Sequence, residues 1–185
     1  MPFLHTEDHT SLAYDDWGSG PSVVFVHGWV LGADAWEYQT SMLSEQGFRC
    51  VAYDRRGCGR SDRPGTGYDF DTLADDLAAL IEHLDLSEVT LVGHSMGCGD
   101  IARYLTRHGP SRIARAALIA PTTPFLLQTP DNPEGVDASV FDFMVSQLVA
   151  DRPQFLALAA PSFFGQALTP ELLQWGVGLA RRSPL

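Results

Sequence analysis

The segment Val89–Gly97 limits the possible folds of this 185-residue chain more than any other. Val89–Val92 predicts a short buried strand, Gly93–Gly97 reads Gly-His-Ser-Met-Gly, and Asp100–Arg107 carries apolar residues at helical spacing. A serine on so sharp a turn is strained, and flanking glycines let its backbone approach neighbouring elements without a Cβ in the way. Strand, G-x-S-x-G turn and helix together are typical of a nucleophile elbow. The alternative is a small-residue turn in which Ser95 has no chemical role.

Strands and helices are predicted to alternate as far as residue 120. Ser22–Val26 is a continuous apolar run, which is typical of a parallel strand covered on both faces. The alternation predicts an α/β fold with a mostly parallel, doubly wound sheet. The predicted strands are Phe3–Thr6, Ser11–Tyr14, Ser22–Val26, Arg49–Tyr53, Val89–Val92 and Ile113–Ile119.

Two of the intervening helices have defined expected ends or faces. Thr72 is expected to be an N-cap, with Asp75 three residues later as an acidic relative of the capping box. In a helix from Ala33 to Glu45, three side chains are expected to face the sheet, namely Trp36, Met42 and Leu43. The buried stripe of the helix opened by Thr72 is expected to be Leu73, Leu77, Leu80, Ile81 and Leu84.

The sequence changes character after Ala120. Prolines punctuate residues 121–133, and helical segments follow near 140–149, 153–160 and 170–180. We predict a core of residues 1–120 and a helical cap of residues 121–185 over the carboxyl edge of the sheet, where open α/β sheets bind ligands. Apolar residues expected to line an acyl pocket are Val30, Met144, Leu148, Phe155, Phe163, Phe164 and Trp175. Alternatively, the cap residues only pack the cap onto the core.

Composition excludes several classes of partner. The net charge is −11, and all twelve basic residues are arginine, so neither nucleic acid nor an anionic membrane surface is an expected partner. Three cysteines form no C-x-x-C pair, which favours a reducing, cytoplasmic compartment, and Cys98 is interpreted as helix packing. We see no secretion signal and no apolar stretch of membrane-spanning length. His27 and His94 lack the spacing of a metal site, so neither metal nor cofactor is expected.

Serine chemistry needs an oxyanion site and a base. The backbone N–H of Met96, the residue after the candidate nucleophile, is one expected oxyanion donor. The loop after Ser22–Val26 is expected to supply the other through the backbone of Trp29. The side chain of Trp29 is interpreted as an aromatic wall of the pocket, and the two roles are compatible.

No residue of the sequence is a candidate for the general base that would activate Ser95. All six histidines are interpreted as structural, and the residues after Ile119 offer no carboxylate. In α/β hydrolases the acid and the histidine follow the serine, so this sequence is expected to stop before either appears and to be nearly inactive by itself. The histidines are His5, His9, His27, His83, His94 and His108.

Several sequence blocks resemble the α/β-hydrolase group of non-haem chloroperoxidases and aryl esterases. The blocks are Asp16–Gly20, His27–Trp29, Asp54–Gly57, Ala74–Leu77, Leu84–Leu86, Gly93–Gly97, Ala102–Tyr104, Arg107–Gly109 and Asn132–Gly135. The resemblance implies an α/β-hydrolase fold with Ser95 as nucleophile and with Trp29 and Met96 as oxyanion donors. The last two strands of that fold, which carry the acid and the histidine, are expected to be absent. Val30 departs from the group's haloperoxidases, which often have proline after the tryptophan, and Cys58 stands where histidine is usual.

The residues and the resemblance together predict a serine hydrolase that acts on a small-molecule carboxylic ester or carboxylic acid. One alternative is a cofactor-free perhydrolase, which forms a peracid from a carboxylic acid and peroxide at the same serine. Another is a catalytically inert fragment or ester-binding domain. Because Ile113–Ile119 would form an unprotected edge strand, a homo-oligomer is a further hypothesis.

Overall fold

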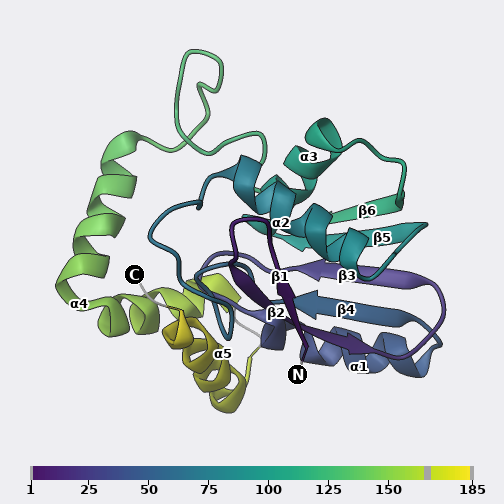
Figure 1. The fold of residues 1–185 in the computed structure, drawn as a ribbon. Helices are drawn as coiled ribbons and strands as arrows, with labels where there is room; N and C mark the ends of the chain where they lie inside the picture. The colour runs from purple at the N-terminus through teal and green to yellow at the C-terminus, as the bar shows by residue number, and fades with distance from the viewer. Residues whose placement is uncertain (1, 165–167, 184–185) are drawn as a thin grey trace.

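A six-stranded sheet forms the centre of the computed structural model, which describes residues 2–164 and 168–183, apart from the side chain of Phe164 (Figure 1). The strand order is β1-β2-β4-β3-β5-β6, with β1, β2 and β4 paired antiparallel and β4, β3, β5 and β6 paired parallel. This arrangement confirms the predicted mostly parallel sheet. The strands are β1 (Phe3–His5), β2 (Ser11–Trp17), β3 (Ser22–Val26), β4 (Arg49–Tyr53), β5 (Val89–His94) and β6 (Ile113–Ile119).

Helices cover both faces of the sheet. Val24 and Val26 of β3 pack toward the helices α2 and α3, whereas Val23 and Phe25 face η1 and α1 on the other side. Burial on both faces explains why β3 is apolar at successive positions. The helices are η1 (a 3₁₀ turn, Ala33–Trp36), α1 (Glu37–Glu45), α2 (Phe70–His83), α3 (Gly97–Arg107), α4 (Ala138–Phe164) and α5 (Pro170–Arg182).

The predicted start of α2 is wrong, although its buried stripe is largely confirmed. Asp69, not Thr72, is the N-cap: its Oδ1 accepts a hydrogen bond from the backbone N of Thr72 at 3.0 Å, and the helix begins at Phe70. Both residue types can cap a helix, and the earlier one captures the free N–H of the first turn. Leu73, Leu77, Leu80 and Ile81 are buried, and Leu84 is partly buried.

The predicted face of the helix at 33–45 is wrong at Met42, which is 52% exposed. The segment begins with the 3₁₀ turn η1, and this turn changes the phase of the residues that follow it. Trp36 is buried as expected, with its ring centroid 5.1 Å from that of Phe25, and Leu43 is partly buried against the same cluster.

The last strand, β6, lies at the end of the sheet. Among the described residues it pairs only with β5, and Leu118 and Ile119 are 44% and 47% exposed. The sequence predicted such an edge at Ile113–Ile119.

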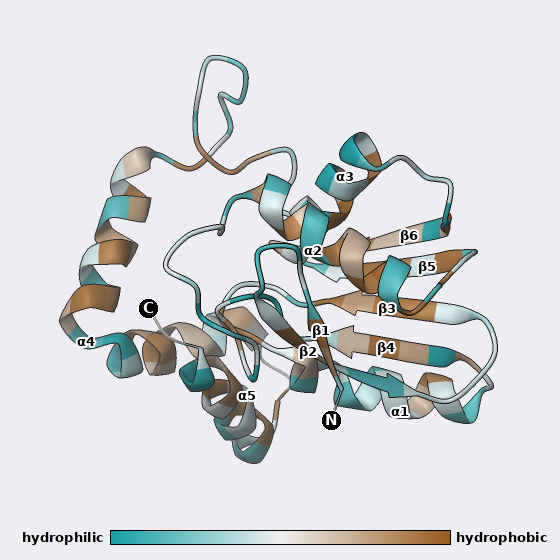
Figure 2. Ribbon diagram, in the orientation of Figure 1, coloured by the Kyte–Doolittle hydropathy of each residue, from teal (hydrophilic) through white to brown (hydrophobic). Residues whose placement is uncertain are grey.

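Two helices follow the sheet. The kinked α4 covers the first two predicted helical segments, with Asp151 non-helical between them (φ −156°, ψ 84°), and α5 covers the third. Residues 121–137 project as a loop at the top of Figure 1. Hydrophobic residues recur along the outer part of α4 in Figure 2, and Val149 and Leu158 are among its exposed side chains. No described helix is long and apolar enough to cross a membrane.

Candidate active site

Ser95 stands at the junction of β5 and α3. Its φ is +53°, a left-handed conformation that a residue with a side chain adopts at a cost. The turn is fixed by hydrogen bonds from the backbone N of Ser95 to the O of Ile119 (2.9 Å) and from the N of Cys98 to the O of Ser95 (3.0 Å). Cys98 is fully buried, which fits its interpretation as a packing residue.

Both glycines of the G-x-S-x-G turn are required by close packing. A Cβ on Gly97 would lie 2.4 Å from the carbonyl O of Val26, and one on Gly93 would lie 2.7 Å from Cδ1 of Ile101. These distances are too short for any other residue without a shift of the backbone or of a core side chain. The glycines therefore allow β3, β5 and α3 to meet directly beneath Ser95.

A cavity of about 1430 Å³ opens above the elbow, and its wall is mostly apolar. Ser95 and Met96 line it together with Trp29, Val30 and Leu31 of the loop after β3. The apolar residues that α4 and α5 contribute to its wall are Ala138, Phe141, Met144, Phe155, Leu156, Ala159, Ala160, Phe163, Val177 and Ala180. The cavity therefore has the character of a site for an apolar small molecule with few polar contacts.

Two backbone N–H groups beside Ser95 have no acceptor among the described residues, those of Trp29 and Met96. The loop that carries Trp29 touches the elbow, because a Cβ on Gly28 would lie 3.2 Å from Cβ of Ser95 and 3.0 Å from Nδ1 of His94. Unpaired N–H donors next to a hydroxyl in a cavity are the components of an oxyanion site.

Val30 gives this loop an unusual backbone. Its φ is +54°, which is rare for a β-branched residue. The side chain is buried against Leu156 and Ala180, so α4 and α5 pack on the loop from above. Proline has φ fixed near −65° and cannot adopt this conformation.

His27 is fully buried, and both of its ring nitrogens are engaged. Nε2 accepts a hydrogen bond from the backbone N of Arg55 at 3.0 Å, so Nδ1 carries the proton and donates to the O of Gly28 at 2.8 Å. Burial, assisted by the positive charge of Arg55, lowers the pKa of His27 to about 4. A neutral imidazole with neither nitrogen free is not a base for Ser95, as the sequence predicted.

The other histidines also have structural positions. The ring of His94 lies against Phe163 with centroids 6.0 Å apart, and burial lowers its pKa. Within the described part of the chain, no histidine is hydrogen-bonded to Ser95, and no group of three or more His, Cys, Asp or Glu side chains is placed to hold a metal ion. His5 contacts Ser11, His83 contacts Tyr14 and His108 contacts Asp75, whereas His9 lies in the turn between β1 and β2, where its backbone N donates to the O of Thr6.

The predicted pocket residues have three different outcomes. Val30, Met144, Phe155 and Phe163 line the cavity. Leu148 is partly buried but is not among the described lining residues, and the wall contributed by α4 passes from Met144 to Phe155. Trp175 is also absent from that wall and packs instead against Tyr38, with ring centroids 5.9 Å apart. The side chain of Phe164 lies outside the described part of the structure.

Sequence reasoning missed two parts of the site. Phe70 and Phe125–Leu127 line the cavity, yet Phe70 is separated from the elbow by 25 positions and has no signal of its own. Asp54 and Arg55, which hold the loop of Trp29, were noted only as part of a motif. Their position directly after a buried strand was the available signal, since polar residues there lie at the carboxyl edge of the sheet.

Comparisons with known proteins agree with this geometry. The family described as "alpha/beta hydrolase fold" matches residues 21–166. A non-heme haloperoxidase of Rhodococcus erythropolis is 47% identical over 166 residues, which cover 89% of this chain and 61% of that protein. This chain therefore spans about three fifths of that relative's length.

Two solved structures have nearly the same backbone. An esterase from Exiguobacterium antarcticum superposes with a TM-score of 0.95 at 36% identity, covering 98% of this chain and 68% of the esterase. A bromoperoxidase from Bacillus anthracis gives a TM-score of 0.93 at 35% identity over the same shares of the two chains.

Proposed function

Because the chain belongs to the α/β-hydrolase fold family, we propose that it is a hydrolase of carboxylic esters with Ser95 as its nucleophile. One observation carries the proposal. Ser95 holds a left-handed conformation on the elbow, at the wall of an apolar cavity and beside two N–H groups that have no acceptor among the described residues. Strain of this kind persists only where the surrounding structure enforces it, and strained residues cluster at active sites.

The proposed reaction begins when Oγ of Ser95 attacks the ester carbonyl carbon. The hydroxyl proton passes to a base as the C–O bond forms, and the carbonyl oxygen becomes an oxyanion that accepts hydrogen bonds from the N–H groups of Trp29 and Met96. Collapse of this intermediate breaks the bond to the alcohol oxygen, which takes the proton back from the base, and leaves an acyl-serine. Water, deprotonated by the same base, then hydrolyses the acyl-serine to the carboxylic acid and restores the Ser95 hydroxyl. The apolar wall suits an ester with an apolar acyl or aryl group.

The base and its acid are proposed to come from outside the described residues. The histidines there are engaged elsewhere or lie apart from Ser95, and in this fold the acid and the histidine follow the serine in chain order. The haloperoxidase relative extends well beyond the length matched by this chain. Without those residues, oxyanion stabilisation and binding alone leave only a small part of the catalysis.

Val30 favours hydrolysis over the alternative reaction, perhydrolysis. Haloperoxidase members of the resembled group often have proline after the tryptophan, and a proline could direct a backbone carbonyl toward bound peroxide. Here φ of Val30 is +54°, which excludes the backbone that proline imposes. We therefore expect ester hydrolysis to exceed peracid formation in a protein that also carries the base and acid.

The test compares three proteins on an aryl ester: the 185-residue chain, the chain extended by the downstream coding sequence, and the extended chain with Ser95→Ala. The extended protein should be labelled at Ser95 by a fluorophosphonate and should hydrolyse the ester. The short chain should be nearly inert, and Ser95→Ala should remove both activities. Robust turnover by the short chain would refute the assignment of the base, and unlabelled Ser95 in the extended protein would favour the inert ester-binding alternative.

A further inference from the structure

The loop that carries Trp29 is anchored at both ends by two consecutive residues that follow β4. At its first end, the backbone N of Arg55 donates to Nε2 of His27 at 3.0 Å, and Nη1 of Arg55 donates to the O of His27 at 3.4 Å. At its other end, the backbone N of Ala33 donates to Oδ1 of Asp54 at 2.7 Å. Residues 28–32, which include both Trp29 and Val30, therefore span two fixed points.

Both anchors are buried. His27, Asp54 and Arg55 are 0%, 2% and 4% exposed, so water does not compete for these hydrogen bonds. The loop also lies in contact with the Asp54 carboxylate, because a Cβ on Gly32 would stand 2.7 Å from its Oδ1. The negative charge is balanced by Arg60, whose Nε lies 2.7 Å from Oδ2 of Asp54.

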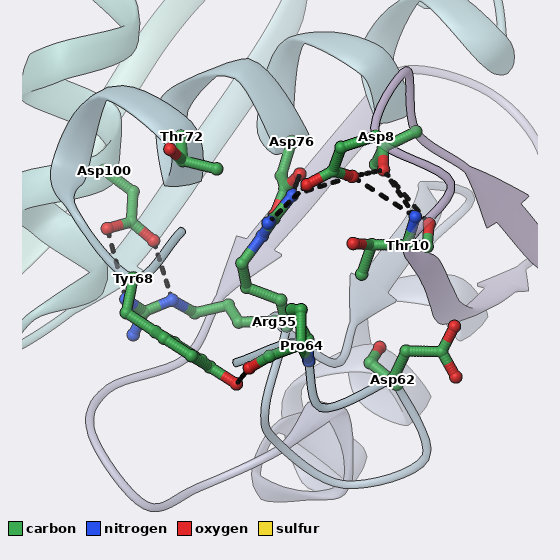
Figure 3. Close-up of polar contacts among 12 residues, drawn as sticks. Asp8, Thr10, Arg55, Asp62, Pro64, Tyr68, Thr72, Asp76 and Asp100 are labelled. Carbon is green, nitrogen blue, oxygen red and sulfur yellow. Dashed lines mark hydrogen bonds and ion pairs between the residues drawn. The ribbon is translucent and has the colours of Figure 1, made fainter. Parts of the chain in front are cut away.

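Arg55 is itself held by the helix that follows the elbow. Nε of Arg55 lies 2.8 Å from Oδ2 of Asp100, and Nη2 lies 3.4 Å from Oδ1. Figure 3 shows the two groups facing each other side-on. Asp100 is fully buried in the first turn of α3, five positions after Ser95. The chain Asp100–Arg55–His27 thus joins the helix below Ser95 to the loop beside it.

We propose that Arg55 and Asp54, with Arg55 held by Asp100, are positioning residues that fix the N–H of Trp29 relative to Ser95. The inference rests on the proposed function, since it assigns a purpose to the oxyanion site. None of the three side chains is among the described residues of the cavity wall, so they act through the loop and not on the substrate. The guanidinium is suited to this task because its planar fork binds a carboxylate and a carbonyl at once.

The next residue provides a matched control. Arg56 is also a buried arginine, 3% exposed, and its Nε lies 2.6 Å from Oδ2 of the buried Asp76. Its other ion-pair partner is Asp8 of the N-terminal hairpin, and none of its hydrogen bonds goes to the loop at 28–32. Loss of the Arg56 pair tests the general cost of removing a buried ion pair.

The experiment uses the double variants Arg55→Met with Asp100→Asn and Arg56→Met with Asp76→Asn, which avoid an unpaired buried charge. Each protein is labelled with 5-fluorotryptophan, and the ¹⁹F resonance of Trp29 is assigned with Trp29→Phe. Trp17, which is on β2 and 59% exposed, is the internal reference. The rate of Ser95 phosphonylation by a fluorophosphonate is measured by mass spectrometry on the same samples, in the short and the extended chain.

The double variant Arg55→Met with Asp100→Asn should shift or broaden the Trp29 resonance and leave the Trp17 resonance unchanged. It should also slow phosphonylation of Ser95 at least tenfold. A tenfold loss is modest beside the 10²- to 10³-fold typical of losing an oxyanion donor altogether. The double variant Arg56→Met with Asp76→Asn should change neither the Trp29 resonance nor the phosphonylation rate, although both double variants should unfold more easily than the wild type.

Equal Trp29 resonances and equal phosphonylation rates in the two double variants would overturn the proposal. A wild-type Trp29 resonance in the double variant of Arg55 and Asp100 would also overturn it. If the double variant of Arg55 and Asp100 does not fold, the single variant Arg55→Lys is measured instead. Lysine keeps the positive charge but lacks the planar guanidinium, so the Trp29 resonance should still shift, by a smaller amount. An unshifted resonance would refute the proposal. If wild-type Ser95 is not labelled in either chain, the proposed function fails, and the Trp29 resonance alone then decides the positioning role.

Discussion

At the scale of single residues, two residues with a left-handed backbone line the cavity at the proposed oxyanion site. They are Ser95, with φ of +53°, and Val30, with φ of +54°. Such conformations cost of order 1–3 kcal/mol each and persist only where packing and hydrogen bonds enforce them. For Val30 the enforcing contacts are Leu156 and Ala180.

The conformation of Val30 predicts the outcome of Val30→Pro. Proline cannot adopt φ of +54°, so the loop must rearrange, and the free energy of unfolding should fall by more than about 1 kcal/mol relative to Val30→Ala. Val30→Ala is the control because it removes the same packing without fixing φ. Urea denaturation measures the difference, and equal stability of the two variants would show that the loop has another accessible conformation.

Burial of His27 predicts a pH dependence of stability. In the unfolded chain His27 takes up a proton near its ordinary pKa of 6.5, whereas in the folded protein burial and Arg55 lower the pKa to about 4. The unfolded state therefore binds more protons between these values, and the free energy of unfolding falls as the pH drops from 6.5 to 4, by up to about 3 kcal/mol.

The free energy of unfolding is measured against pH for the wild type and for His27→Gln. The variant is needed because Asp100 changes stability with pH in the opposite direction. Burial raises the pKa of Asp100 to about 6, so its contribution is lost as the pH rises through that value. Asp54, Arg55 and His94 also act on His27, and all remain in the variant. The wild type should lose more stability than His27→Gln between pH 6.5 and pH 4, and parallel curves would contradict the assignment.

At the scale of elements, the strand–turn–helix unit depends on backbone contact between β3 and α3. Gly97→Ala should destabilise the protein by about 1–3 kcal/mol, because the new Cβ would lie 2.4 Å from the O of Val26 and 2.8 Å from the O of His27. Gly65→Ala is the control, since a Cβ there meets nothing within 4 Å and should change stability by less than about 0.5 kcal/mol. Similar melting temperatures for the two variants would mean that the elbow yields easily.

At the scale of the whole molecule, the sheet ends on an apolar strand. We expect the 185-residue chain to be marginally stable and to self-associate through β6. The outer edge of β6 has no strand partner among the described residues, and Leu118 is 44% exposed. Leu118→Lys should reduce this association, whereas Leu158→Lys, at a more exposed position on α4, should have less effect. Sedimentation velocity over a range of concentrations tests both variants. A wild-type monomer with a sharp thermal transition would contradict the prediction.

The sequence by itself determined the local parts of this protein. The apolar runs located the strands β3, β4 and β6, and the Gly-His-Ser-Met-Gly turn located the elbow, because strand periodicity and turn chemistry depend on neighbouring residues. The interpretation of His27 as structural was also correct, although its sequence position gave only the loop and not the hydrogen bonds.

The tertiary structure alone decided which distant residues meet. Arg55 and Asp100 are 45 positions apart and come together because β4 and β5 flank β3 in the sheet, an order that no local pattern encodes. The cap at Asp69 and the exposure of Met42 likewise followed from the start of α2 and from the 3₁₀ turn before α1. Periodicity shows that a helix has an apolar face, but its phase and position are set by the surface on which it packs.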